Sequence, residues 1–312
     1  MKRTVVTGGF GFIGFHLIKY LLENKEREIS VIDRTPVSSY DNDIKKLIEK
    51  YKSRLNIFNI EIAKSKNFPE TDEIYHLAGS VASKKVKANK DLIYNNIKAL
   101  ENLLSFYSTK QTRILYISSA EVAGDIQQNL PTDENCSIGW TDPSNPRWHY
   151  SIAKFLCETI LTNYPQKINY NIARLSNTYG EQMKHDYVVK SLIKRILNDE
   201  SPLTITNASD TRSFTYVLDI VKGLVKIMES NYTNEVFNLG TPQETSIVSL
   251  AQKLLKIAGK DTKGIEIIDD HTIPERRLPD ITKANRLLHW SPKISLDEGL
   301  MRTYSFYKTL ES

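Results

Sequence analysis

The chain of 312 residues is poor in cysteine, in long apolar runs and in excess charge of one sign. Its two cysteines, Cys136 and Cys157, have no metal-ligand or redox spacing, so we expect no disulfide framework and a reducing compartment, the cytoplasm. No run of about 18 apolar residues predicts a membrane span, and the first residues lack the apolar core of a signal peptide. The net charge is +5 with both signs spread along the chain, which favours small anionic ligands over nucleic acid.

The composition is that of a globular protein, with 25% charged and 40% hydrophobic residues. Collagen-like and wholly disordered classes are therefore excluded. At about 150 residues per domain, the length predicts two domains, or one large α/β unit with an appendage. The sequence contains no internal repeat, low-complexity tract or Gly/Ser linker.

The first 180 residues alternate short β-rich runs with helical patterns, which predicts βαβ units and a parallel sheet. Such strands are nearly all apolar because both faces of a parallel sheet are covered. The predicted strands are 3–7, 28–32, 55–60, 73–77, 113–118 and 170–175. The predicted helices lie near 12–22, 41–51, 90–107 and 150–164, and 127–147 is predicted to be a long loop.

After about residue 177 helical patterns dominate, and one further strand, 235–239, is predicted to return to the sheet. The helices predicted here are 187–197, 218–229, 247–258 and 296–307. This change of pattern predicts a smaller, mostly helical C-terminal region.

Three glycines, Gly8, Gly11 and Gly14, lie three residues apart between the first predicted strand and the first predicted helix. They permit a tight turn, close approach of the backbone to a pyrophosphate, and close packing of helix on strand. The N–H groups at the start of the helix, at Phe12 and Ile13, would then face the phosphates. The strand before and the helix after distinguish this dinucleotide-binding pattern from a structural glycine turn.

Asp33 ends the next predicted strand, about 20 residues beyond the third glycine. Its carboxylate can accept hydrogen bonds from both hydroxyls of an adenosine ribose and would repel a 2′-phosphate, which favours NAD over NADP. Arg34 beside it reduces that preference. We therefore predict an α/β protein with a doubly wound parallel sheet of the Rossmann type and a smaller, mostly helical C-terminal region.

Tyr150 and Lys154 open a predicted helix at positions i and i+4, so their side chains share one face. A free tyrosine titrates near 10, and a neighbouring ammonium with a bound nicotinamide cation lowers that pKa by favouring the phenolate. Ser119 follows the predicted strand 113–118, at the carboxyl end where such sheets bind ligands. Its hydroxyl can therefore bond the same substrate oxygen as Tyr150.

Together, Thr-Gly-Gly-x-Gly-x-x-Gly, the strand-end pair Ser118-Ser119 and Tyr-x-x-x-Lys resemble the extended short-chain dehydrogenase/reductases that modify nucleotide-diphosphate sugars. The resemblance runs along essentially the whole chain, and segments 75–79, 173–180, 212–217 and 237–240 also match. It implies NAD as cofactor and a homodimer formed through the helices near 90–107 and 150–164. It also implies an NAD-binding Rossmann domain over 1–176, with a returning segment near 210–242, and a nucleotide-sugar-binding region over 177–312.

The resemblance also implies roles for individual residues. The expected cofactor-binding residues are Gly8, Gly11, Phe12, Ile13, Gly14, Asp33, Arg34, Asn59, Ile60, Leu77, Ala78, Gly79, Tyr150 and Lys154. The expected catalytic residues are Ser119, Glu121, Tyr150, Lys154 and Arg277, with Asn177, Arg212 and Arg277 binding substrate. No metal is predicted.

The branches of this family share oxidation at C4 of the sugar and differ in the later steps. Glu121 matches a glutamate that resembling decarboxylases and dehydratases carry and that 4-epimerases commonly lack. Segments 146–151 and 275–281 resemble UDP-glucuronate decarboxylases, in which the arginine aligned with Arg277 serves the uronate. Arginine suits a carboxylate because its fork bonds two oxygens at once. The sequence thus predicts decarboxylation of a UDP-uronic acid, with a 4-epimerase or a 4,6-dehydratase as alternatives.

Three departures from the family pattern bear on these alternatives. Ala120 stands where sugar 4,6-dehydratases have an Asp, so proton delivery to a departing C6 hydroxyl would need another donor. Ala123 replaces a usual Tyr and alters the pocket, and Asn59 replaces an Asp that holds the adenine amine in many relatives. An asparagine can still accept that hydrogen bond. A non-catalytic NAD-binding regulator is the alternative of another class, but the Ser, Tyr and Lys of the site are all present.

Overall fold

The computed structural model describes residues 1–79, 91–125, 129–185, 187–268 and 275–311. The chain divides into two compact units. Unit 1 comprises Met1–Gln127, Ser137–Arg174 and Val221–Phe237, and unit 2 comprises Gln128–Cys136, Leu175–Ile220 and Asn238–Ser312. The chain therefore leaves unit 1 and returns to it twice.

Within the described residues, the main sheet has seven strands in the order β11-β6-β5-β4-β1-β2-β3. They are β1 (Lys2–Thr7), β2 (Arg27–Asp33), β3 (Leu55–Asn59), β4 (Glu73–His76), β5 (Arg113–Ser119), β6 (Asn169–Leu175) and β11 (Glu235–Leu239). Strand β1 is parallel to both β2 and β4, its two neighbours. The chain therefore builds the sheet outward from β1 in one direction and then from β4 in the other. Such a switch point is where open α/β sheets bind ligands, at the carboxyl ends of the strands.

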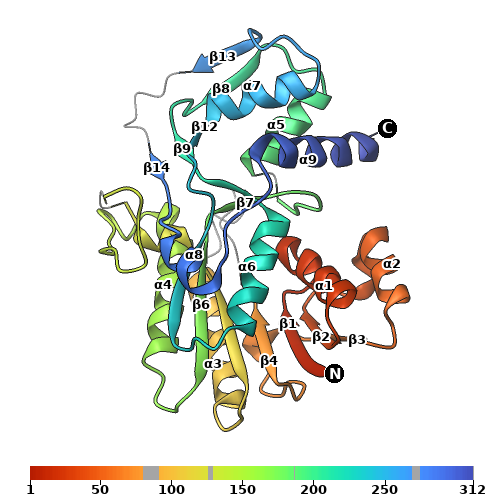
Figure 1. The fold of residues 1–312 in the computed structure, drawn as a ribbon, viewed down its shortest axis with the longest axis vertical. Coiled ribbons are helices and arrows are strands. Elements are labelled where there is room, and N and C mark those ends of the chain that lie inside the picture. The colour runs from red at the N-terminus through yellow and green to blue at the C-terminus, as the bar shows by residue number, and fades with distance from the viewer. Residues whose placement is uncertain (80–90, 126–128, 186, 269–274, 312) are drawn as a thin grey trace. The chain divides into compact units, whose positions relative to one another are not determined.

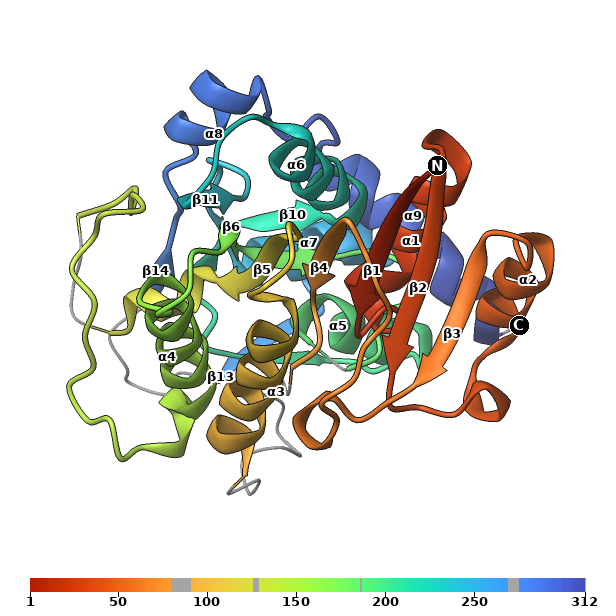
Figure 2. The ribbon, with the colours of Figure 1, turned by 90° about the horizontal axis from the view of Figure 1, so that it is seen from below.

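Helices cover both faces of this sheet, with α3 and α4 on one face and α1 and α6 on the other (Figures 1 and 2). The helices of unit 1 are α1 (Phe12–Asn24), α2 (Asn42–Lys50), α3 (Leu92–Tyr107), α4 (His149–Thr162) and most of α6 (Val217–Glu229), with short 3-10 turns η1 (Val37–Ser39), η2 (Ile62–Lys64), η3 (Ala120–Ala123) and η4 (Pro146–Trp148). Val5 and Ile74 of the sheet pack in one buried cluster with Leu100 and Leu103 of α3 and Leu161 of α4. Because both faces are covered, most residues of β1, β4 and β5 are buried.

Unit 2 combines helices with short strands. Its helices are α5 (Val188–Leu197), α7 (Ile247–Ile257), α8 (Thr282–Leu288) and α9 (Leu296–Glu311). Its strands are β7 (Asn177–Tyr179) paired with β10 (Phe214–Tyr216), β8 (Leu203–Thr206) paired with β13 (Ile265–Ile268), and a trio in the order β12 (Thr245–Ser246), β9 (Thr211–Arg212) and β14 (Arg276–Arg277). The pairing of β9 with β14 brings together two segments that are far apart in the sequence.

The structure confirms the predicted Rossmann-type architecture, including the return of strand 235–239 to the sheet beside β6. The helix predicted from residue 41 begins one residue later, because the Asp41 side chain accepts the Ile44 N–H and caps it. The predictions missed the helix α8, and they also missed the short strands of unit 2, so this unit contains more β structure than expected. Residues 90, 127 and 128 of the predicted elements lie outside the described residues.

No helix in the described part of the chain has the length and apolarity that a bilayer crossing requires.

Candidate active site

The loop between β1 and α1 depends on glycine at two places. Gly8 has φ +64°, a left-handed backbone conformation that residues other than glycine rarely adopt. A Cβ there would also lie 2.9 Å from the Ala78 backbone. A Cβ on Gly14 would lie 2.5 Å from the Gly8 carbonyl oxygen. The loop is therefore pressed against the end of β4, and the first turn of α1 is pressed against the loop.

The first turn of α1 is open to an anion. Gly11 is its N-cap, and among the described residues no side chain caps the turn and no acidic side chain lies in it. The first N–H groups of a helix have no partner within the helix and carry the positive end of its dipole. The N–H groups of Phe12 and Ile13 are thus suited to a pyrophosphate.

Asp33 joins the glycine loop to the ends of β2 and β3. Its carboxylate accepts the Phe10 N–H at 3.2 Å and the Thr35 N–H at 3.0 Å, and its carbonyl accepts Asn59 Nδ2 and the Ile60 N–H, both at 3.2 Å. A carboxylate oxygen can accept more than one hydrogen bond, so Asp33 keeps capacity for ribose hydroxyls. The expected adenosine residues are therefore adjacent in the structure, and Arg34 beside them is exposed.

The end of β4 is held by a buried polar contact. Thr7 Oγ1 lies 2.7 Å from His76 Nδ1 and accepts the Ala78 N–H at 3.1 Å, while Leu77 N–H donates to the Thr7 carbonyl. Burial lowers the pKa of His76 to about 3, and the charge of Lys154 acts in the same direction. His76 is therefore neutral and fixes this strand end.

Lys154, on α4, is a buried cation of unit 1. It is 4% exposed, and its ammonium donates to the Ile117 carbonyl at 2.7 Å. Its Nζ lies 4.8 Å from the centre of the Tyr116 ring and 6.0 Å from that of Tyr150. Burial lowers the pKa of Lys154 to about 8, against the opposing effect of Cys157 and Glu158. The buried amine thus sits near the Tyr150 phenol, as the i, i+4 spacing predicts.

Ser119 lies at the carboxyl end of β5, two residues beyond the carbonyl that Lys154 binds. It is buried and caps η3, where its Oγ accepts the Glu121 N–H at 3.2 Å. The neighbouring Ser118 Oγ is also buried and has no hydrogen-bond partner within the described residues. An unpartnered buried hydroxyl is costly unless a ligand or water completes it, so this strand end is consistent with a ligand-binding position.

Gly79 shows why an expected cofactor residue is glycine. A Cβ there would lie 3.0 Å from Asn96 Oδ1 and 3.5 Å from Lys154 Nζ. Asn96 and Tyr116 were not among the predicted site residues, although both contribute to the surroundings of Lys154. Tyr116 lies within an apolar strand, where no local pattern would have singled it out.

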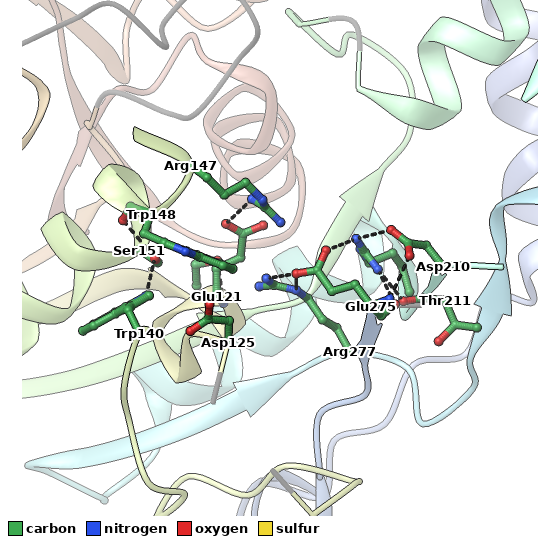
Figure 3. A network of polar contacts seen from close by, with 12 residues as sticks. Glu121, Asp125, Trp140, Arg147, Trp148, Ser151, Asp210, Thr211, Glu275 and Arg277 are labelled. Carbon is green, nitrogen blue, oxygen red and sulfur yellow. Dashed lines mark hydrogen bonds and ion pairs between the residues drawn. The ribbon is translucent and has the colours of Figure 1, made fainter. Parts of the chain in front are cut away.

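Glu121, in η3 after β5, and Arg147, in η4 before α4, lie next to each other in unit 1 (Figure 3). Arg147 Nη1 lies 3.9 Å from Glu121 Oε2, and its guanidinium stacks over the Trp148 ring at 4.8 Å. Trp140, from the predicted long loop, donates its indole N–H to Ser151 Oγ at 3.0 Å. That loop therefore anchors the start of α4, next to Tyr150, and this anchor was not predicted.

The predicted substrate-binding residues lie in unit 2. Arg212 and Arg277 stand opposite each other on β9 and β14, and both bind the Glu275 carboxylate. Asn177 is exposed at the start of β7, opposite Phe214. The structure thus brings the two arginines together around Glu275, which was not among the predicted site residues.

The described residues contain no group of three or more His, Cys, Asp or Glu side chains arranged to hold a metal ion.

The switch-point sheet, the glycine loop opening α1, and a tyrosine and a buried lysine on α4 define a dinucleotide-binding protein of the dehydrogenase/reductase type. The model of the NAD dependent epimerase/dehydratase family matches residues 4–240. The chain belongs to this family, and it is an NAD-dependent enzyme.

Curated relatives and solved structures agree with this assignment. The chain is 35% identical to UDP-glucuronic acid decarboxylase 6 of Arabidopsis thaliana, over 96% of this chain and 86% of the relative. It is 28% identical to UDP-N-acetyl-alpha-D-glucosaminuronate decarboxylase of Bacillus cytotoxicus, over 100% of this chain and 99% of the relative. The UDP-glucuronic acid 4-epimerase of Bacillus cereus, solved with UDP-glucuronic acid and NAD, superposes with a TM-score of 0.87 at 28% identity over 99% of both chains.

Proposed function

We propose that the protein is a decarboxylase of a UDP-linked uronic acid, of the UDP-glucuronate type. The observation that carries this proposal is the 35% identity to a UDP-glucuronic acid decarboxylase over 96% of the chain, together with the presence of Glu121 and Arg277. The buried Lys154 beside Tyr150 supports the initial oxidation at C4.

The residues that would hold NAD fit that group. The open first turn of α1 suits the pyrophosphate, Asp33 the adenosine ribose, and Lys154 the nicotinamide ribose. When bound, NAD supplies a hydride acceptor for C4 of the sugar and a hydride donor if the product ketone is reduced.

Tyr150 would take the proton of the C4 hydroxyl, with Ser119 bonding the same oxygen. A phenol at its ordinary pKa near 10 is a weak base at neutral pH, so the nearby ammonium of Lys154 would favour the phenolate. These residues would also bond the C4 oxygen when it gains negative charge in the next step.

With a ketone at C4, the C6 carboxylate becomes that of a β-keto acid. The C5–C6 bond breaks, CO2 leaves, and the electron pair passes through C5 to the C4 oxygen to give an enolate. The enolate then regains the ketone as C5 takes up a proton, and we propose that Glu121 serves C5 and Arg277 binds the departing carboxylate. We further propose that Asn177 and Arg212 bind the diphosphate.

The test is mass spectrometry of products after incubation with NAD and, separately, UDP-glucuronate, UDP-glucose and UDP-N-acetylglucosamine. Loss of the mass of CO2 from the uronate supports the proposal. Loss of the mass of water from a hexose would identify a dehydratase instead, despite Ala120. An unchanged mass with a new chromatographic peak would identify an epimerase.

A 4-epimerase is the second candidate, because the structure of a UDP-glucuronic acid 4-epimerase superposes on the chain so completely. The presence of Glu121 favours the decarboxylase over this candidate. The product assay separates the two, since only decarboxylation changes the mass.

We also propose that the enzyme is a cytoplasmic homodimer. Neither Cys136 nor Cys157 forms a disulfide in the described part of the chain, and Cys157 is buried, as expected for a reducing compartment. Helices α3 and α4 pack against the same buried cluster, and Tyr94 on α3 is 65% exposed. Sedimentation equilibrium should give twice the mass of the chain, and a monomeric mass would refute the dimer.

A further inference from the structure

The side chains of Glu275 and Arg277 meet where β14 begins (Figure 3). Arg212, on β9, binds the same Glu275 carboxylate. The two oxygens of the Glu275 carboxylate are divided between two arginines. Oε1 accepts Arg277 Nε at 3.0 Å and also Arg277 Nη2, and Oε2 accepts Arg212 Nη2 at 2.5 Å. One carboxylate of the chain thus engages both arginines that are proposed to bind the substrate's anionic groups.

The strand register explains why these side chains meet. Parallel pairing places Arg277 opposite Arg212 and Arg276 opposite Thr211. Successive side chains of a strand point to opposite faces, so Glu275 and Arg277 share one face. Arg276 lies on the other face and binds Glu244.

The main chain of Glu275 is held independently of its side chain. Its N–H donates to Asp210 Oδ1 at 2.8 Å, and its carbonyl accepts the Thr211 N–H at 3.0 Å and Arg212 Nη1 at 2.8 Å. The carboxylate can therefore leave the arginines by rotation of its own side chain while the backbone stays in place.

The Glu275 carboxylate offsets positive charge that is largely removed from water. The Arg212 and Arg277 side chains are 15% and 13% exposed, and a cation removed from water is costly without a partner. Asp210 and Glu275 both bind the Arg212 guanidinium, but Asp210 also accepts the Glu275 N–H. Glu275, at 32% exposed, is the carboxylate that an incoming anion can replace with the least rearrangement.

We propose that Glu275 is an internal competitor that occupies Arg212 and Arg277 until an anionic group of the substrate displaces it, and that it is therefore a specificity-determining residue. This inference rests on the proposed function, which assigns both arginines to the substrate. A single carboxylate that replaces Glu275 leaves the charge of the cluster unchanged. A nucleoside diphosphate brings more charge and more acceptor oxygens, so Glu275 selects for polyanionic ligands.

The test is calorimetric titration of the NAD-loaded protein with UDP, for the wild type and three variants. Glu275→Gln removes the charge and keeps the shape, and we expect it to bind UDP about tenfold more tightly. Glu275→Asp keeps the charge but shortens the reach by one methylene, and its affinity should lie between the two. Glu244→Gln is the matched control, because Glu244 binds the adjacent Arg276, and its UDP affinity should equal that of the wild type.

An unchanged or weaker UDP affinity in Glu275→Gln would overturn the inference, because Glu275 would then hold the arginines in place without competing. A UDP affinity of Glu275→Asp below that of the wild type would overturn the inference for the same reason. UDP binding requires no turnover, so a failure of the proposed reaction would appear in the product assay, whereas a failure of this inference appears in the order of the affinities.

Discussion

At the scale of single residues, the function proposed for Tyr150 depends on one oxygen atom. Tyr150→Phe keeps the ring on α4 and removes the hydroxyl, so we expect kcat with UDP-glucuronate to fall by about 10²- to 10⁴-fold. Binding of UDP, measured by calorimetry, should stay close to that of the wild type. Near-normal turnover in this variant would disprove the role of Tyr150 as the C4 base.

Lys154 allows a pH prediction whose sign comes from its burial. Its pKa is lowered to about 8 in the folded chain, whereas an exposed lysine titrates near 10.4. Between these values the unfolded chain binds more protons, so this group makes the folded protein more stable as the pH rises. Below a pH of about 8, Lys154 is charged in the folded protein, which then bears the full free-energy cost of burying that charge.

The measurement is urea denaturation of the NAD-free wild type and of Lys154→Met at pH 7 and pH 9.5. We expect the stability of the wild type to improve relative to the variant by about 2 kcal/mol over this interval. The comparison at two pH values removes the constant loss of the hydrogen bond to Ile117. Parallel pH dependences would show that Lys154 titrates as an ordinary lysine.

At the scale of elements, the packing of α1 on the glycine loop predicts the effect of a single methyl group. A Cβ at Gly14 would meet backbone atoms of Gly8 and Gly9 at 2.5–2.7 Å, and backbone cannot move aside as a side chain can. Gly14→Ala should therefore displace α1 from the loop, lower the free energy of unfolding by about 1–3 kcal/mol, and weaken NAD binding at least tenfold.

Gly264→Ala is the control for this prediction, because its nearest neighbour, the Asp261 carbonyl, would be at an ordinary 3.4 Å. NAD affinity, determined by fluorescence titration, should be unchanged in Gly264→Ala. Equal NAD affinities in the two variants would contradict the role of the glycine loop in binding the cofactor.

The short elements show which parts of the fold could be predicted. Strands of five to seven residues, such as β1 and β5, carry enough apolar residues to be recognised. The two-residue strands β9 and β14 carry no periodicity, and they form because distant segments pair with them. The pairing that joins Arg212 to Arg277 was therefore beyond the reach of sequence patterns.

At the scale of the whole chain, a buried ionic network connects the start of unit 1 to its last returning segment. Glu73 is fully buried, and its carboxylate binds Lys2 at 2.6 Å, Arg27 at 3.1 Å and the Thr4 hydroxyl at 2.8 Å. Arg27 also binds Glu229, at the end of α6. The network thus joins β1, β2, β4 and α6.

Glu73→Gln removes the negative charge that Lys2 and Arg27 share and should lower the free energy of unfolding by about 3 kcal/mol, as expected for a broken buried pair. Glu229→Gln, at a partly exposed position, should cost less than about 1 kcal/mol. Thermal and urea denaturation test both values, and equal losses would mean that burial of Glu73 does not matter.

The sequence by itself determined the parallel sheet, the dinucleotide loop, and the pairing of Tyr150 with Lys154. Each of these depends on local spacing, since an i, i+4 pair must share a helix face and a glycine triplet between strand and helix must form a tight turn. Only the tertiary structure decided that Tyr116 lies beside the Lys154 ammonium and that Glu275 occupies Arg212, 63 positions away. The first contact arises because helix α4 packs on strand β5, and the second because β9 pairs with β14. No local pattern records which distant elements will meet.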